Sequence, residues 1–217
     1  MKFEGEYLNG KELLGNNYNE DGNIYQCNKI NGKGEEYCGY NSKFECEYLN
    51  GQKNGKGKEY YVHDYLKFEG EFLNDKKNGR GKKYYYGAGY KLEFEGIYLN
   101  DKKWEGKGFD TLNNLVYELK NGKGLIKEYH WDGELEFEDE YLNRKRNGKG
   151  KEYFNGYLEY EGEYLNGKRN SKGKEYNWEG KLIFEGEYLN GKRNGKGKEY
   201  NLDGKLIFGV NIYMAFN

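Results

Sequence analysis

The sequence predicts an all-β fold, an elongated and twisted single-layer antiparallel sheet built from tandem β-hairpins. Three observations lead to this prediction. An aromatic-led segment recurs along the whole chain, residue types alternate within each copy, and 34 glycines with no proline separate the alternating runs. Repeats of this kind pack on their neighbours, so the length of 217 residues measures the number of copies.

The clearest copy runs from Phe184 to Tyr200 and reads FEGEYLNGKRNGKGKEY. Its first residues alternate with a period of two, as in a strand with two distinct faces. A helix is excluded because glycine recurs too often and the aromatics lack helical spacing. We expect a four-residue loop at 191–194, a return strand, and a second turn at Asp203 and Gly204 with positive φ at both residues.

The four-residue loop also sets an expected register. It would place Tyr188 opposite Gly197 on one face and Glu187 opposite Lys198 on the other. An aromatic ring can lie flat over a glycine of the adjacent strand. Opposed Glu and Lys would form a solvated ladder, which accounts for a chain that is 34% charged and yet has a net charge of -1.

The copies extend over almost the whole sequence. Their first aromatics are Phe3, Tyr25, Phe44, Phe68, Phe94, Tyr117, Phe137, Tyr160, Phe184 and Phe208. We therefore expect one array over 1–217, with about nine copies and irregular stretches at 8–43 and 104–130. The apolar end at 208–217 is expected to be a terminal strand that caps the array or pairs with another chain.

The segment FEGEYLNGKRNGKGKEY resembles the MORN repeat, whose pattern is approximately Y-x-G-x-W/Y-x-x-G-x-x-x-G-x-G. Clear copies cover 44–60, 68–84, 94–109 and 137–208, while Cys46 and Asp139 replace the first glycine of their copies. The resemblance implies an antiparallel sheet that acts as a spacer, dimerisation surface or protein-docking platform. In some family members the repeats precede a lysine methyltransferase or phosphatidylinositol-phosphate kinase domain, or sit near membranes; here the repeats occupy the chain.

Residue types for catalysis are scarce. The histidines are His63 and His130, the serines Ser42 and Ser171, and the threonine Thr111, so a nucleophile with its base is not expected. A ladder of similar Glu residues paired with Lys does not create the one raised and one low pKa that acid-base catalysis requires. We therefore expect that the protein is not an enzyme.

Cofactor and metal motifs are also missing from the pattern. The recurring Asn-Gly-Lys-Gly segments lack the spacing, hydroxyl and following helix of a phosphate loop. Cys27, Cys38 and Cys46 do not have zinc-site spacing, and the segment 19–23 lacks the spaced ligands of a calcium loop. We expect no metal, no cofactor and free thiols.

The start of the chain has no apolar signal region, and no apolar run is long enough to span a membrane. An odd number of cysteines favours a reducing compartment. We therefore expect an intracellular, cytoplasmic protein, which could be associated with a membrane or an assembly.

These observations lead to the hypothesis of a structural or protein-interaction module whose partner is another protein or a second copy. Alternatives are a peripheral tether to anionic lipid and an antitoxin-like inhibitor; a nucleic-acid partner is not expected. The candidate interaction surface consists of aromatics expected to lack a covering layer, namely Tyr48, Phe72, Tyr98, Tyr141, Tyr164, Tyr188, Phe208 and Tyr213. The candidate lipid-facing loops carry Lys168, Arg169, Lys192 and Arg193.

Overall fold

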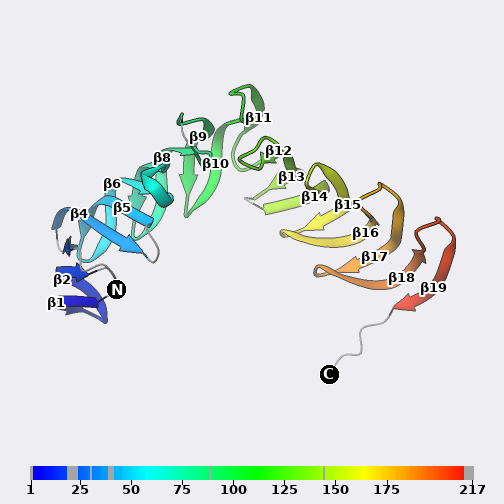
Figure 1. The fold of residues 1–217 in the computed structure, drawn as a ribbon, viewed down its shortest axis with the longest axis horizontal. Coiled ribbons are helices and arrows are strands. Elements are labelled where there is room, and N and C mark those ends of the chain that lie inside the picture. Colours follow the sequence, from blue (N-terminus) through cyan, green and yellow to red (C-terminus); the bar gives the residue numbers. More distant parts are fainter. Residues whose placement is uncertain are drawn as a thin grey trace. The chain divides into compact units, whose positions relative to one another are not determined.

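The structure is a computed structural model that describes residues 2–18, 24–29, 31–38, 42–87, 89–143 and 145–212. It forms two compact units, 1–114 and 115–217, which are described separately. The described residues contain β-strands and a short 3-10 turn at Val62–Asp64, with no α-helix among them. The predicted all-β fold of consecutive antiparallel hairpins is confirmed (Figure 1). A single array over 1–217 stays a prediction.

The first unit contains two sheets in which each strand pairs antiparallel with the next along the chain. One sheet has the order β1-β2-β3, and the other continues in chain order from β4 to β10. The strands are β1 (Lys2–Leu8), β2 (Lys11–Tyr18), β3 (Ile24–Asn28), β4 (Asn31–Cys38), β5 (Ser42–Leu49), β6 (Gln52–Tyr60), β7 (Leu66–Leu73), β8 (Lys76–Tyr84), β9 (Leu92–Leu99) and β10 (Lys102–Phe109).

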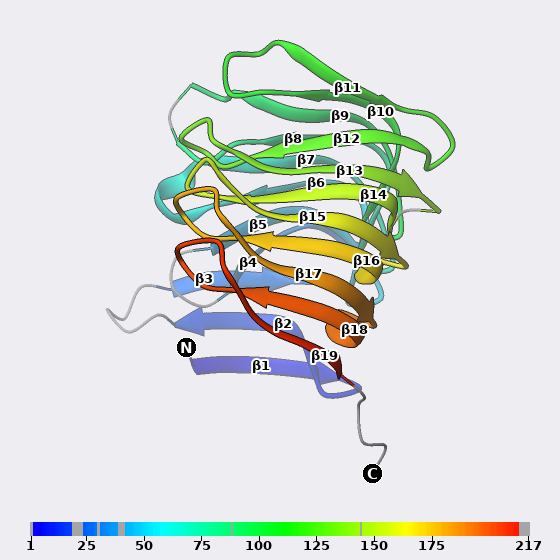
Figure 2. The same cartoon turned by 90° about the vertical axis from the view of Figure 1, so that its right-hand side faces the viewer.

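The second unit begins with β11 (Leu115–Leu119), which a turn at 120–123 connects to β12 (Gly124–Tyr129). From β12 to β19 the strands lie side by side in chain order (Figure 2). The remaining strands are β13 (Leu135–Leu142), β14 (Lys145–Phe154), β15 (Tyr157–Leu165), β16 (Lys168–Tyr176), β17 (Leu182–Leu189), β18 (Lys192–Tyr200) and β19 (Leu206–Ile212). The start of the predicted terminal strand therefore lies in β19, and 213–217 lies outside the described residues.

The first turn of each hairpin is shorter than the sequence suggested. Leu189 pairs with Lys192, and the two residues between them, Asn190 and Gly191, have φ of 53° and 89°. Positive φ at both central residues is typical of the type I′ turn that matches the twist of a hairpin, and Asn tolerates this region better than most residues. The predicted four-residue loop at 191–194 is therefore wrong.

The register changes with the turn. Tyr188 pairs with Arg193, and a register shift then brings Gly186 opposite Gly197 and Glu185 opposite Lys198. The predicted pairs of Tyr188 with Gly197 and of Glu187 with Lys198 are wrong, because the irregularity leaves Glu187 between the two paired stretches. The consequence is a pair of glycines side by side in the middle of the hairpin.

The second turn also differs from its prediction. The side chain of Asn201 accepts hydrogen bonds from the amides of Asp203 (3.0 Å) and Lys205 (2.9 Å). Among the described residues of this turn only Gly204 has positive φ, 77°. An Asn side chain that mimics a backbone turn explains why Asp203 keeps an ordinary φ.

Hairpins are also joined through their first turns. The amide of Gly191 donates to the carbonyl of Arg169 (2.8 Å), and the amide of Gly167 donates to the carbonyl of Arg146 (2.9 Å). In the first unit Asp75 takes the glycine position, and its carboxylate accepts the amide of Lys53 (2.8 Å). Each turn therefore fixes its hairpin to the one before it.

Candidate functional site

The aromatic face of the sheet is built on the paired glycines. A Cβ atom on Gly186 or Gly197 would lie 2.6 to 2.7 Å from ring atoms of Phe184. The ring thus occupies the space that side chains at these positions would fill, and Phe184 is completely buried. Tyr160 covers Gly162 and Gly173 in the same way. Glycine is required here for close approach of a ring to the backbone.

The second aromatic of each hairpin joins neighbouring hairpins. Tyr188 meets Phe184 of its own hairpin and Tyr160 of the preceding one edge to face, with centroids 5.7 and 5.3 Å apart. Tyr98 makes the same contacts with Phe94 (5.5 Å) and Phe68 (5.2 Å) in the first unit. Edge-to-face contacts of this kind add to the gain from burial, so these rings form a continuous core along the sheet.

Arginine side chains cover this core in the second unit. The guanidinium carbons of Arg169 and Arg193 lie 4.0 Å from the ring centroids of Tyr160 and Phe184. Carboxylates hold them in place: Arg193 contacts Glu175 and lies 2.6 Å from Glu199. In the first unit Lys77 lies over Phe68 instead, at 4.4 Å. A cation over a ring is stabilising, so a charged layer completes the core.

The electrostatics keep this layer charged and the ring hydroxyls neutral. Burial raises the pKa of Tyr160 to about 12. Burial and the hydrogen bond that the Tyr188 hydroxyl donates to Glu175 (2.6 Å) raise the pKa of Tyr188 further. Burial opposes ionisation of Glu175, but its bonds with Arg193 and Tyr188 outweigh burial and lower the pKa of this carboxyl.

The predicted aromatic interaction surface was expected to be exposed, but most of its described rings are buried. Tyr141 is half-buried, the ring of Phe208 and all of Tyr213 lie outside what the structure describes, and the other five rings are buried: Tyr48, Phe72, Tyr98, Tyr164 and Tyr188. The sequence reasoning missed the cover because it did not anticipate cations above the rings. A partner would have to displace that charged layer to reach these side chains.

The predicted lipid-facing loops are only partly available. Lys168 and Lys192 are exposed at the first turns. Arg169 and Arg193 point onto the aromatic face, where they contact Glu152 and Glu175. Their charges are already neutralised by these carboxylates, so the loops offer an anionic surface less charge than the sequence suggested.

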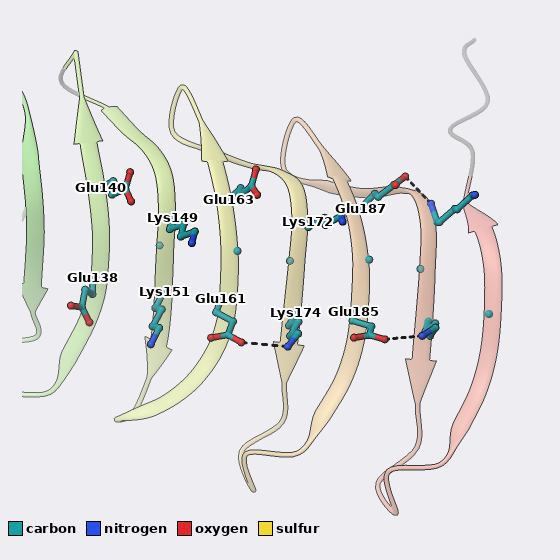
Figure 3. Close-up of a pocket in the computed structure, with 18 of the residues that line it drawn as sticks. Glu138, Glu140, Lys149, Lys151, Glu161, Glu163, Lys172, Lys174, Glu185 and Glu187 are labelled. Carbon is teal, nitrogen blue, oxygen red and sulfur yellow. Dashed lines mark hydrogen bonds and ion pairs between the residues drawn. The ribbon is translucent and has the colours of Figure 1, made fainter.

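The opposite face of the second unit carries a groove of about 930 Å³. Its floor is a track of glycine backbone, which includes Gly162, Gly173, Gly186 and Gly197. Glu and Lys alternate from strand to strand in two rows beside this track (Figure 3). One row is Glu138, Lys151, Glu161, Lys174, Glu185 and Lys198, and the other is Glu140, Lys149, Glu163, Lys172, Glu187 and Lys196.

The first row is fixed by tyrosines. Tyr200 donates a hydrogen bond to Glu185 (2.7 Å), which also pairs with Lys198 (3.1 Å). In the preceding hairpin, β15–β16, Tyr176 likewise donates a hydrogen bond to Glu161 (2.6 Å). The same arrangement recurs in the first unit, where Tyr84 donates to Glu69 (2.7 Å). A carboxylate held by a hydroxyl and a cation keeps its charge in a defined position.

The second row is fixed by the backbone. The carboxylate of Glu187 accepts the amide of Lys196 (3.0 Å), and that of Glu71 accepts the amide of Arg80 (2.8 Å). Each carboxylate folds over the glycine before that amide, Gly195 or Gly79, where a Cβ would collide with it. Both glycines have positive φ, 80° and 112°. The charged rows are therefore preorganised.

The first unit carries a similar groove of about 1560 Å³. Gly57, Gly70, Gly81 and Gly96 contribute to it, with Glu and Lys or Arg alternating beside them. Cys46 stands in the glycine track, where its sulfur lies close to Gly57. Burial raises the pKa of this thiol to about 11, so it is a packed side chain without thiolate character at neutral pH.

Asp139 is the other substitution in the glycine track, and it is completely buried opposite Gly150. Arg146 Nε lies 2.8 Å from its Oδ2, but the alignment is not that of a hydrogen bond, and neither carboxylate oxygen accepts one from a described residue. Burial raises its pKa to about 7, against the effect of Arg146. It faces the aromatic side and does not open into a groove.

The described residues contain no group of three or more His, Cys, Asp or Glu side chains placed to hold a metal ion. His130 pairs with its turn neighbour Asp132 (2.7 Å), and His63 lies exposed in the 3-10 turn. What the arrangement offers is two rows of fixed charges beside a track of glycine backbone, which is suited to recognition.

The family comparison agrees with this repeat geometry. The model of the MORN repeat matches residues 45–62, 68–87, 160–177 and 184–205. The chain contains MORN repeats. MORN repeats are generally modules for binding proteins or membranes, and proteins that contain them are generally not enzymes. No curated protein matches the chain in sequence. Among the described residues, no helix has the length and apolar character to cross a membrane.

The groove formed by these MORN repeats was not predicted from the sequence, for two reasons. The Glu and Lys positions were interpreted as a solvated ladder, and the glycines as partners of the rings alone. The signal that could have identified the groove is that each glycine of the pair is flanked on both sides by Glu or Lys, as in Glu185-Gly186-Glu187 and Lys196-Gly197-Lys198.

Proposed function

We propose that the chain is a non-enzymatic protein-interaction module whose Glu/Lys face binds a segment of a partner protein along the glycine track. The observation that carries this proposal is the groove of about 930 Å³ with its glycine floor between two rows of fixed charges. A groove with a low floor admits a chain segment, and alternating charges at its walls select for a complementary charge pattern.

The aromatic face supports the proposal by exclusion. Its rings are buried beneath arginines and lysines that already have carboxylate partners, such as Arg193 with Glu175 and Lys77 with Glu59 (2.8 Å). Opening this layer would leave buried charges unpaired, which is strongly unfavourable. The Glu/Lys face requires no such rearrangement, because Glu187, Lys172 and Lys196 are exposed in place.

A protein segment fits the groove better than an anionic lipid surface does. Each lysine of the walls has a glutamate on the adjacent strand, as in Lys172 with Glu187 and Lys174 with Glu185. The face therefore has little net positive charge to attract anionic headgroups. A partner segment that carries both signs can satisfy both rows.

Site-specific photo-crosslinking tests the groove directly. A photoreactive residue replaces Glu163, which is exposed in the groove. The matched control replaces Trp178, which is 72% exposed at the tip of a turn outside the groove lining. We expect a defined protein adduct from the groove position that the turn position does not give.

Charge reversal and vesicles complete the test. Lys172→Glu with Lys196→Glu should abolish the adduct, whereas Lys168→Glu with Lys192→Glu at the turns should retain it. A lipid tether would instead be favoured if the chain binds phosphatidylserine vesicles and the Lys168→Glu, Lys192→Glu variant does not. Equal adducts from the groove and turn positions would contradict the proposal.

A further inference from the structure

The edge strand β1 exposes an aromatic that most of the other hairpins bury. Tyr7 is 58% exposed, whereas Tyr188 at the same hairpin position is 4% exposed. The difference has a direct cause: Tyr188 packs against Tyr160 of the preceding hairpin, and β1 forms the edge of its sheet. Tyr7 does meet Phe3 of its own hairpin, at 5.0 Å. What it lacks in the described sheet is the ring of a preceding hairpin.

The last complete hairpin, β17–β18, shows the complementary deficiency. The side chain of Glu199 on β18 is 44% exposed, whereas Glu175 and Glu152 in the same position of the two preceding hairpins are each 18% exposed. Glu175 is covered because it accepts the hydroxyl of Tyr188 from the following hairpin. Glu199 pairs with Arg193 of its own hairpin, and the position of the following tyrosine is taken by Ile212 of β19, which has no hydroxyl.

Strand β19 departs from the repeat at three further positions. It pairs with β18 in the register of a first strand, so Gly209, Val210 and Asn211 stand opposite Lys198, Gly197 and Lys196. First strands inside the array carry Glu, Gly and Glu at these three positions. An example is β17, where Glu185, Gly186 and Glu187 lie opposite residues of β16. The two lysines of β18 thus lack the glutamates of a following strand.

Strand β1 supplies all the residues that β19 lacks. Its sequence Phe3-Glu4-Gly5-Glu6-Tyr7 matches Phe184-Glu185-Gly186-Glu187-Tyr188 position by position. On the β18 edge, Glu4 and Glu6 would oppose Lys198 and Lys196. Tyr7 would then reach Phe184 and Glu199 as Tyr188 reaches Tyr160 and Glu175.

We propose that β1 of one copy replaces β19 on the β18 edge of a second copy, so that chains join head to tail. This is a heterologous contact, which adds subunits in series. It uses the sheet edges, and Lys196 and Lys198 of the β18 edge also line the end of the groove. Because β19 is tethered and competes at a high effective concentration, the association depends strongly on protein concentration.

One residue opposes the fit and provides a sharp test. Glu12 pairs with Tyr7 in the register, where the other well-formed hairpins carry Lys or Arg, such as Arg193 opposite Tyr188. In the joined array Glu12 would lie beside Glu199 of the second copy. Glu12→Arg should therefore strengthen the association, by analogy with Arg193, which contacts Glu175 of the preceding hairpin. The same change removes the ion pair of Glu12 with Lys29 of its own chain (3.8 Å), so the free energy of unfolding of the variant is measured alongside.

Sedimentation velocity of the full chain across protein concentrations tests the proposal. We expect species heavier than the 25.6 kDa monomer that increase with concentration. Glu12→Arg should shift this association to lower concentration, and Tyr7→Ser, which removes the 58% exposed ring, should abolish it. A wild-type chain that stays monomeric at all concentrations, together with a monomeric Glu12→Arg variant, would overturn the proposal.

Charge exchange identifies the two edges. Glu4→Lys with Glu6→Lys, and separately Lys196→Glu with Lys198→Glu, should each be monomeric. Their mixture should associate again, with the two variants in alternation, because each edge of one variant is then complementary to the opposite edge of the other. The matched control, Lys145→Glu with Lys168→Glu, reverses two exposed charges at the first turns of interior hairpins, outside the groove lining, and should associate like the wild type. Association unaffected by either edge pair would overturn the proposal.

Discussion

Gly173 lies beneath the ring of Tyr160, and a Cβ atom at Gly173 would be 2.6 Å from Tyr160 Cε2. Gly173→Val should therefore displace the ring and lower the free energy of unfolding by about 1–3 kcal/mol, measured by urea denaturation. Gly209→Ala is the matched control, because nothing lies within 4 Å of a Cβ there, and it should be nearly neutral. Equal stability of the two variants would show that the ring does not depend on this glycine.

Ser171 should be replaceable by glycine with a gain in stability. It has φ of 62° at the position where other hairpins have glycine, such as Gly195 and Gly79. A left-handed conformation costs a non-glycine residue about 1–2 kcal/mol, and the extra freedom of glycine in the unfolded chain offsets about 0.4–1 kcal/mol of this. Ser171→Gly should therefore raise the free energy of unfolding by up to about 1.6 kcal/mol, measured by thermal denaturation under matched conditions. A less stable variant would contradict this prediction.

Asp139 should make stability depend on pH. Its folded pKa of about 7 lies above the ordinary value of 3.8, so the folded state binds more protons between these values. The free energy of unfolding should therefore fall as pH rises from about 4 to about 7, by at most about 4 kcal/mol at 1.36 kcal/mol per pKa unit. Asp139→Asn should flatten this slope in urea denaturation, whereas Asp203→Asn, at an exposed turn, should keep it.

Cys46 should react slowly with thiol reagents in the folded protein. Its side chain is buried, and its raised pKa of about 11 leaves almost no thiolate at pH 8. In a Cys27→Ser, Cys38→Ser background, alkylation of Cys46 should be slow in buffer and fast in urea. An equally fast reaction in buffer would mean that the glycine track opens at this position.

The sequence was sufficient for the fold class because the period-two pattern and the recurring glycines leave few other structures. It was not sufficient for the register, which depends on whether Asn190 adopts a left-handed conformation and where the strand bulges. The error in register had a large effect on the site: it placed Tyr188 over Gly197, when Phe184 lies there. The arginine cover was out of reach because Arg169 and Arg193 were interpreted as exposed loop residues. The groove was missed because of the error in register, since only the true register aligns the glycines into one track.

The bond from the amide of Gly191 to the carbonyl of Arg169, repeated from hairpin to hairpin, has a mechanical consequence. In each sheet spatial order follows chain order, so a pull on the two ends of a sheet loads its outermost strands first. The ladder bonds of an edge strand, and the turn bond that joins its hairpin to the next, would then open before those of the interior strands. Such a sheet would lengthen under tension by shedding hairpins from its ends while the interior stays folded.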